Sequence, residues 1–237
     1  SNSPYILEMR NVSKTFPGVK ALDQINLRVK RGSVHALMGE NGAGKSTLMK
    51  ILYGIYIPDE GGELILDDKP FKPGRPIDAI RRGLTMVPQE ISPAANLTIA
   101  DNFYLGREIT KGKFFLNQKA MNEQASAILK ELGVPMDVTE KMSDVSVAKA
   151  QLVAIATAVS NDAKVIIMDE PTTALTENEV DQLYRIIETV KARGIAIIFI
   201  SHKLDEVFRV SDEITVIRDG QYVDTKPTKE VTKEQLI

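Results

Sequence analysis

A glycine-rich segment in the first quarter of the chain has the spacing of a phosphate-binding loop. Gly39 is followed, after four residues, by Gly44, Lys45 and Ser46, which matches the pattern G-x4-G-K-S. Glycines let backbone N–H groups curl around an anion, and the N-terminus of the next helix adds partial positive charge. Lys45 would reach the terminal phosphates and the Ser46 hydroxyl would bind Mg²⁺. The predicted phosphate-binding residues are Gly39, Glu40, Asn41, Gly42, Ala43, Gly44, Lys45, Ser46 and Thr47. The alternative is a glycine-rich turn that binds nothing.

Two carboxylates, Asp169 and Glu170, directly follow the apolar run 165–168. Ligands of parallel sheets lie beyond the carboxyl ends of the strands, so this acidic pair is expected where the phosphate-binding loop also opens. Asp169 suits Mg²⁺, through a water bound to the ion, and Glu170 suits the orientation or deprotonation of an attacking water. The alternative is a solvated acidic turn without chemistry.

Patterns of apolar residues predict the elements that hold these two segments. A strand over 33–38 runs straight into Gly39, and Leu48, Ile51 and Leu52 recur after it at helical spacing, up to Gly54. Apolar, β-branched strands separated by helices predict an α/β fold with a largely parallel sheet covered on both faces. Further strands are expected at 22–29, 62–66, 84–87, 165–168 and 196–200, and further helices at 99–106, 117–132, 148–159 and from about residues 76, 177 and 203.

Composition excludes several classes of protein. The chain has 237 residues, 43% of them apolar, and its 30 basic and 32 acidic side chains give a net charge of −2, which disfavours tight non-specific nucleic-acid binding. It has no cysteine and two histidines, which removes disulfides, thiolate nucleophiles and multi-histidine metal sites. The longest apolar run, 195–200, has six residues, against the roughly 20 of a membrane-spanning helix. These observations indicate a reducing, cytoplasmic setting.

With both motifs in order, the chain resembles the ATP-binding-cassette (ABC) ATPases over nearly its whole length. Gln89 corresponds to the Q-loop glutamine, which would contact Mg²⁺ or water, and residues 173–176 lie where the D-loop belongs. His202 corresponds to the switch histidine, which in the family contacts the γ-phosphate, and Phe16 occupies the place of the aromatic residue that stacks on adenine. Taken singly, Gln89 could be a solvated amide, His202 a strand-end histidine and Phe16 a core aromatic. His35, inside a predicted strand, is assigned to packing.

The family's signature segment, Leu-Ser-x-Gly-Gln-x-Gln, corresponds to residues 145–151 here. Ser146 and Gln151 match this pattern, whereas Val145, Ala148 and Lys149 depart from it. The resemblance implies that Ser146 binds the γ-phosphate of ATP held by an opposite cassette. The Ala148 methyl group could weaken this contact, because the backbone must approach phosphate closely there. The alternative is a helix that only packs.

The resemblance also implies a fold and a division of the chain. We expect one domain over 1–237, an α/β P-loop NTPase core with a largely parallel sheet and an antiparallel β part. The core would comprise 1–88 and 161–237, and an α-helical subdomain with the signature segment would be inserted at 89–160. Residues 89–91 and 96–108 are similar to monosaccharide importer ATPases of the ribose and galactose kind. Beside them, Ile99, Phe103 and Leu105 either receive a helix of a membrane subunit or pack inside the subdomain.

On this resemblance, the chain is expected to be the first cassette of an ATPase that hydrolyses MgATP to power sugar import. The expected partners are a second cassette, membrane permease subunits and, indirectly, a sugar-binding protein, with the cassette held at the cytoplasmic face of the membrane. Two alternatives remain open. One is a soluble ABC protein that acts as a nucleotide-gated clamp on a ribosome or DNA, and the other is a regulatory cassette that binds ATP without hydrolysing it.

Overall fold

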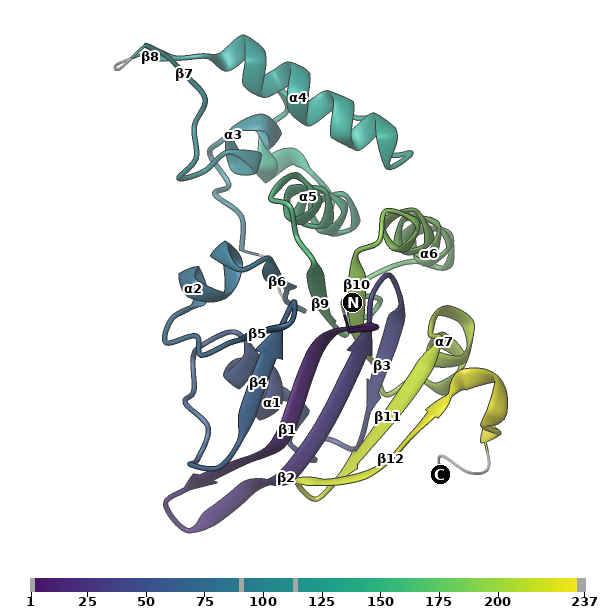
Figure 1. The fold of residues 1–237 in the computed structure, drawn as a ribbon. Helices are drawn as coiled ribbons and strands as arrows, with labels where there is room; N and C mark the ends of the chain where they lie inside the picture. The colour runs from purple at the N-terminus through teal and green to yellow at the C-terminus, as the bar shows by residue number, and fades with distance from the viewer. Residues whose placement is uncertain (1–2, 90–91, 113–114, 234–237) are drawn as a thin grey trace.

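A single large sheet organises the chain. In the computed structural model, which describes residues 3–89, 92–112 and 115–233, ten strands form it in the order β5-β4-β1-β2-β12-β11-β3-β10-β9-β6 (Figure 1). Neighbouring strands of one half pair in parallel, which confirms the predicted α/β core. These strands are β3 (Val34–Met38), β6 (Leu84–Val87), β9 (Val165–Asp169), β10 (Ala196–Ile200) and β11 (Glu213–Arg218).

The other half of the sheet is antiparallel except where β12 pairs in parallel with β2. A long hairpin at its centre pairs on one side with a strand that follows the first helix, and on the other side it meets the core where Asp23 pairs with Gln221. Four strands of the sheet, at residues 5–16, 69–70, 213–218 and 221–227, were not among the strands predicted from sequence. The antiparallel strands are β1 (Tyr5–Phe16), β2 (Val19–Lys30), β4 (Glu63–Leu66), β5 (Lys69–Pro70) and β12 (Gln221–Pro227).

Helices cover both faces of the parallel strands, as predicted. In β9, Ile166 and Met168 pack toward the cluster that contains α5 and α6, whereas Val165 and Ile167 pack toward the cluster that contains α1. Successive side chains of a strand point to opposite faces of the sheet. Because both faces of β9 are covered by helices, the residues on each face are apolar. The helices are α1 (Lys45–Leu52), α2 (Pro76–Arg81), α3 (Ile99–Phe103), α4 (Gln118–Glu131), α5 (Val147–Ser160), α6 (Glu177–Ala192) and α7 (Leu204–Val210), with short 3₁₀ turns η1 (Met142–Asp144) and η2 (Thr228–Glu230).

Local sequence explains where most helices begin. Pro76 opens α2 at its first position, and Asn117 accepts a hydrogen bond from the Ala120 N–H at the start of α4. α6 begins with a capping box, in which Glu179 accepts from both the backbone N–H and the hydroxyl of Thr176. Helix starts were therefore readable from side chains that satisfy the first free N–H groups.

The helices between β6 and β9 form one group. α3, α4 and α5 gather at one end of the molecule, above the sheet in the view of Figure 1, and share one apolar cluster. α3 is shorter than predicted and ends at Phe103, because the chain leaves helical geometry before Gly106, which has φ +76°. A small hairpin of β7 (Thr110–Lys111) and β8 (Phe115–Leu116) follows, which the sequence did not predict. No helix in the described part of the chain combines the length and the apolar character needed to span a bilayer.

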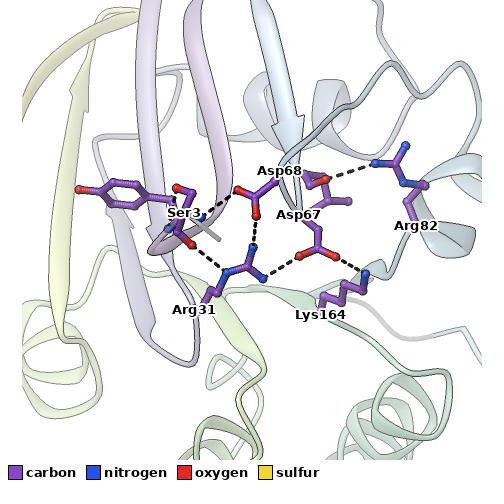
Figure 2. A network of polar contacts seen from close by, with 8 residues as sticks. Ser3, Arg31, Asp67, Asp68, Arg82 and Lys164 are labelled. Atoms are coloured by element: carbon purple, nitrogen blue, oxygen red, sulfur yellow. Dashed lines mark hydrogen bonds and ion pairs between the residues drawn. The ribbon is translucent and has the colours of Figure 1, made fainter. Parts of the chain in front are cut away.

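An acidic turn ties the antiparallel strands to the parallel core. In the β4–β5 turn, Asp67 accepts from Arg31 at 2.7 Å and from Lys164 at 2.5 Å, and Asp68 accepts from Arg31 at 3.1 Å (Figure 2). Arg31 precedes β3 and Lys164 precedes β9, so this network lies at the amino ends of the parallel strands. We call Arg31, Asp67, Asp68 and Lys164 the acidic clasp.

Candidate functional site

The topology brings the two predicted motifs to one edge of the sheet. β3, which ends at Met38, and β9, which ends at Asp169, both pair in parallel with β10 between them. Their carboxyl ends therefore open on the same side, where ligands of parallel sheets bind. A cavity of about 230 Å³ lies there, lined by Ala21, Glu40, Asn41, Gly42, Gly44, Lys45, Ser46, Thr47, Gln89, Asp169 and Glu170.

The backbone of the 39–47 loop requires glycine at two positions for different reasons. Gly44 has φ +105°, and a Cβ there would lie 2.6 Å from the Leu22 side chain. A Cβ on Gly39 would lie 2.3 Å from the Ile217 carbonyl oxygen. Directly after Gly44, α1 begins without a side-chain cap. The first N–H groups of α1 therefore face the cavity without an intrahelical partner, which is the usual anion-binding arrangement.

Lys45 folds back over this loop. It is buried, and its Nζ donates to the carbonyl oxygens of Gly39 and of Glu40, the latter at 3.0 Å. Burial lowers the pKa of Lys45, while the charges of Glu170 and Asp169 act in the opposite direction. The ammonium group is therefore positioned inside the loop by weak, neutral acceptors that a phosphate oxygen can replace.

The acidic pair is asymmetric. Burial raises the pKa of Asp169, the neighbouring charge of Glu170 adds to the rise, and Lys45 opposes it. Glu170 has φ +47°, and its Oε1 lies 2.8 Å from His202 Nδ1. Its Oε2 is buried without a hydrogen-bond partner among the described residues. A buried carboxylate oxygen without a partner, facing a polar cavity, is where a bound water or ligand group fits.

The donor set fits a magnesium ion. A Ser46 hydroxyl, an Asp169 carboxylate and a Gln89 amide oxygen line the same cavity, and such hard oxygen donors suit Mg²⁺. No cluster of three or more His, Cys, Asp or Glu side chains able to hold a metal occurs among the described residues. This agrees with an ion that takes its remaining ligands from phosphate oxygens and water.

The histidines divide as their positions in the sequence indicated. His202 follows β10, is 59% exposed, and contacts Glu170. His35 is fully buried in β3, with its Nε2 2.7 Å from the Thr215 hydroxyl, so its assignment to packing is confirmed. Burial lowers the pKa of His35 to about 4.

Five of the predicted site residues do not line the cavity: Gly39, Ala43, His202, Phe16 and Ser146. Phe16 lies at the end of β1, half-buried, edge-to-face with Tyr56 at 5.1 Å between ring centroids. Ser146 caps α5, where its hydroxyl accepts from the Lys149 N–H at 3.3 Å, and it is exposed. Their roles in binding ATP remain predictions. Glu90 and Ile91 lie outside the described residues.

Other contacts around the site were not predicted. Ala21, on β2, lines the cavity, and no sequence signal marks it because the contact depends on how the antiparallel strands meet the core. Gln151, predicted only as a match to the signature, is buried and donates to the Pro171 carbonyl at 2.6 Å. Since Pro171 follows Glu170, this hydrogen bond joins α5 to the acidic loop.

The apolar residues beside Gln89 separate into two kinds. Ile99 and Phe103 are buried in the shared cluster of α3, α4 and α5. Leu105, beyond the end of α3, is 58% exposed. Packing therefore accounts for the first two, and Leu105 alone of the three is available to a partner.

Comparison with known proteins identifies relatives over the whole chain. A family model described as ABC transporter matches residues 22–173. A putative ribose/galactose/methyl galactoside import ATP-binding protein of Geobacillus kaustophilus is 50% identical over 98% of this chain and 46% of its own length. A galactose/methyl galactoside import ATP-binding protein of Photobacterium profundum is 47% identical over 100% of this chain and 47% of its own length. The chain thus spans about half the length of these curated relatives.

Solved structures agree in fold. The crystal structure of the ADP conformation of an ATP-binding cassette of an ABC transporter superposes with a TM-score of 0.82 at 27% identity, covering 99% of this chain and 94% of that one. A protein from Clostridium perfringens that is part of an ABC transporter complex gives a TM-score of 0.82 at 26% identity, covering 99% and 93%. These similarities extend to both halves of the sheet and to the helices between them.

Proposed function

The chain belongs to the ABC transporter family, and from this premise we propose that it is an ATP-binding cassette that hydrolyses MgATP to power the import of a monosaccharide. The observation that carries the proposal is the single cavity lined by Lys45, Ser46, Asp169 and Glu170. The names of relatives that cover the full chain, all import ATP-binding proteins for ribose or galactosides, support the transported class.

The roles of the side chains follow from where charge develops during in-line attack of water on the γ-phosphate. The enzyme has little covalent chemistry to do, so positioning and charge stabilisation dominate. Lys45 and the first N–H groups of α1 stabilise the phosphate oxygens. Glu170 orients the attacking water and accepts its proton, and the 2.8 Å contact with His202 Nδ1 holds its other oxygen.

Ser46, Asp169 and Gln89 are the residues that would hold Mg²⁺. The bound ion would neutralise charge on the phosphates, which lowers the cost of attack by water. Thr47 and Asn41 also line the cavity, and they would make the remaining contacts with the phosphates. Phe16 would stack on adenine, worth about 1–3 kcal/mol.

The proposed site is completed by a second cassette. Ser146, Val147 and Lys149 are exposed at the start of α5 and do not line the cavity of their own chain, which suits contact with ATP in an opposite cassette. The relatives are about twice as long, so we assign the chain to the first half of a fused pair. Residues 89–160 act as a helical subdomain, and exposed Leu105 is its contact with a membrane permease at the cytoplasmic face.

One observation favours a second candidate, a regulatory cassette that binds ATP without hydrolysing it. Ala148, where the family signature has glycine, is buried at 7% exposure near the start of α5, so its methyl group restricts the approach of phosphate to that backbone. The names of the relatives favour an importer over a clamp on ribosome or DNA.

A reconstitution experiment tests the proposal. The chain, within its full-length polypeptide, is co-expressed with multi-span membrane proteins encoded beside it, and ATP turnover is measured in vesicles. Co-purification and stimulation of turnover by a ribose- or galactose-loaded binding protein are the expected results. ATP binding without turnover would favour the regulatory cassette, and salt-sensitive ribosome or DNA binding without a permease would favour the clamp.

A further inference from the structure

Glu206, on the first turn of α7, binds both chain neighbours of His202. The hydroxyl of Ser201 donates to Glu206 Oε2 at 3.0 Å, and Lys203 Nζ lies 3.0 Å from Oε1. The Ser201 hydroxyl in turn accepts from the Lys203 N–H at 3.1 Å. The turn that presents His202 is therefore closed on both sides around one carboxylate.

The same carboxylate also holds the loop that presents Glu170. Thr172, two residues after Glu170, donates its hydroxyl to Glu206 Oε1 at 2.6 Å. Thr172 and Ser201 are both buried, at 2% and 0% exposure, and the Glu206 side chain is 12% exposed. Buried donors of this kind must keep an acceptor, so they fix Glu206 as firmly as Glu206 fixes them.

We propose that Glu206 is a positioning residue that holds His202 against Glu170. The two loops leave adjacent parallel strands, β9 and β10, and among the described residues the exposed His202 ring has one side-chain partner, Glu170 at 2.8 Å. Glu206 joins the two loops close to that contact. It binds Thr172, two residues after Glu170, and it binds Ser201 and Lys203, the residues on either side of His202. Its consequence for catalysis rests on the proposed function, whereas its effect on the His202–Glu170 contact does not.

The geometry separates positioning from ATP binding. Among the described residues, Glu206 has no hydrogen bond or ion pair with the 39–47 loop, which follows β3 and includes Lys45 at the start of α1. Loss of its carboxylate therefore loosens the pair that handles the attacking water and leaves the phosphate-binding loop intact. A misplacement of about 1 Å at a reacting group can lower the rate by up to about a hundredfold.

Nitrogen NMR of the two histidine rings tests the contact directly in the chain 1–237. Because the chain has two histidines, each ring is assigned without ambiguity, and buried His35 reports whether the fold persists. Glu206→Gln keeps the side chain's shape but replaces one carboxylate oxygen with an amide N–H₂, which faces either the Ser201 hydroxyl or the Thr172 hydroxyl and Lys203 Nζ. Thr172→Val removes one donor at constant shape, and Glu188→Gln, at an exposed position of α6, is the matched control.

In the wild type and in Glu188→Gln, we expect His202 Nδ1 to give the signal of a nitrogen that carries a bonded proton. In Glu206→Gln, and less in Thr172→Val, this signal moves toward its value in the urea-unfolded chain, while the His35 signals stay in place. Unchanged His202 signals in both variants overturn the proposal. Equal movement of His35 and His202 also overturns it, because Glu206 would then only support the fold.

Steady-state kinetics supply a second readout in the full-length polypeptide. Glu206→Gln is expected to lower kcat between about tenfold and a hundredfold, with KM for MgATP within twofold of the wild type. A raised KM with unchanged kcat contradicts the assignment. If the wild type itself does not hydrolyse ATP, the proposed function fails, and the ring signals still decide the role of Glu206.

Discussion

At the scale of single residues, the site combines groups that no single motif contains. Glu170 presents one oxygen to His202 and keeps the other buried and without a partner among the described residues, while Lys45 rests on two backbone carbonyls. Both arrangements leave a polar group ready to bind a water molecule or an anion in the cavity. The proposed chemistry depends on these two groups, which line the same cavity.

Glu170→Gln tests the role of the carboxylate. Gln keeps the size of the side chain and loses its basicity, so nucleotide affinity is retained while turnover falls at least about a hundredfold, the usual contribution of a positioned general base. Calorimetry measures ATP affinity and phosphate release measures turnover in the assembled transporter. Unchanged turnover would remove Glu170 from this role.

Lys45→Ala tests the phosphate-binding loop. A charge-assisted hydrogen bond contributes about 1.5–3 kcal/mol, so ATP affinity is expected to fall between about tenfold and a hundredfold. Lys50→Ala is the matched control, because Lys50 lies exposed on the same helix. Titration calorimetry that gives Lys45→Ala the affinity of Lys50→Ala would contradict the assignment.

His35 makes stability depend on pH. Burial lowers the pKa of His35 to about 4, from 6.5 when unfolded, so the unfolded chain binds more protons between these values. The stabilisation is complete above pH 6.5 and is lost as pH falls toward 4, at a cost of up to about 3 kcal/mol. Urea unfolding between pH 7 and 4.5 should show this slope, and His35→Gln should flatten it. Equal slopes in both proteins would exclude His35 as the source.

The sequence predicted the residues of the site whose signals are local. The 39–47 loop and the 169–170 pair lie within a strand and its following turn, so spacing alone indicated them, and their meeting followed from parallel pairing. Ala21 and Glu206 could not be found in this way, because their contacts depend on how β2 and α7 pack. Ser146 does not line the cavity of its own chain, so its proposed role with a second cassette stays a prediction.

At the scale of elements, sequence patterns predicted the buried strands and the capped helices. β9 and β10 are continuous apolar runs between helices, and α6 begins at a capping box. Local sequence therefore indicates the two strands and the start of the helix. Apolar and polar residues alternate only weakly in β11 and β12, and both strands carry charged residues. β12 exposes most of its side chains. The position of the two strands is fixed by pairing with β3 and β2. The acidic clasp likewise joins residues far apart in the chain and has no sequence signal.

Asp67→Asn tests the acidic clasp. Asp67 has φ +53°, which Asn tolerates, so the substitution removes charge without straining the turn. Hydrogen bonds from Lys164 and Arg31 lower the pKa of Asp67 to about 2, so its contribution is present above pH 3.8 and is lost as pH falls through about 2. These partly exposed pairs are expected to contribute about 1 kcal/mol, which high salt reduces.

Asp162→Asn is the control for this prediction. Asp162 also has φ +53° and has no ion pair among the described residues, so it reports the effect of the substitution on a turn alone. Urea unfolding at pH 7 should show a loss for Asp67→Asn that exceeds the loss for Asp162→Asn. Equal losses would mean that the clasp does not stabilise the junction between the two halves of the sheet.

At the scale of the whole molecule, the sheet places opposite tasks at opposite edges. The acidic clasp closes the amino ends of β3 and β9, whereas the cavity opens at their carboxyl ends, so the clasp can hold the two halves together without obstructing the site. α3, α4 and α5 gather at one end of the molecule (Figure 1), and the exposed Ser146 at the start of α5 does not line the cavity of its own chain.

A structure of the Glu170→Gln protein with MgATP tests the central claim most directly. The account predicts the triphosphate within residues 39–47, with Lys45 on its terminal phosphates and one metal ion between Ser46 and Asp169. Nucleotide bound elsewhere on the chain, or phosphates in the loop with the metal remote from Asp169, would contradict it.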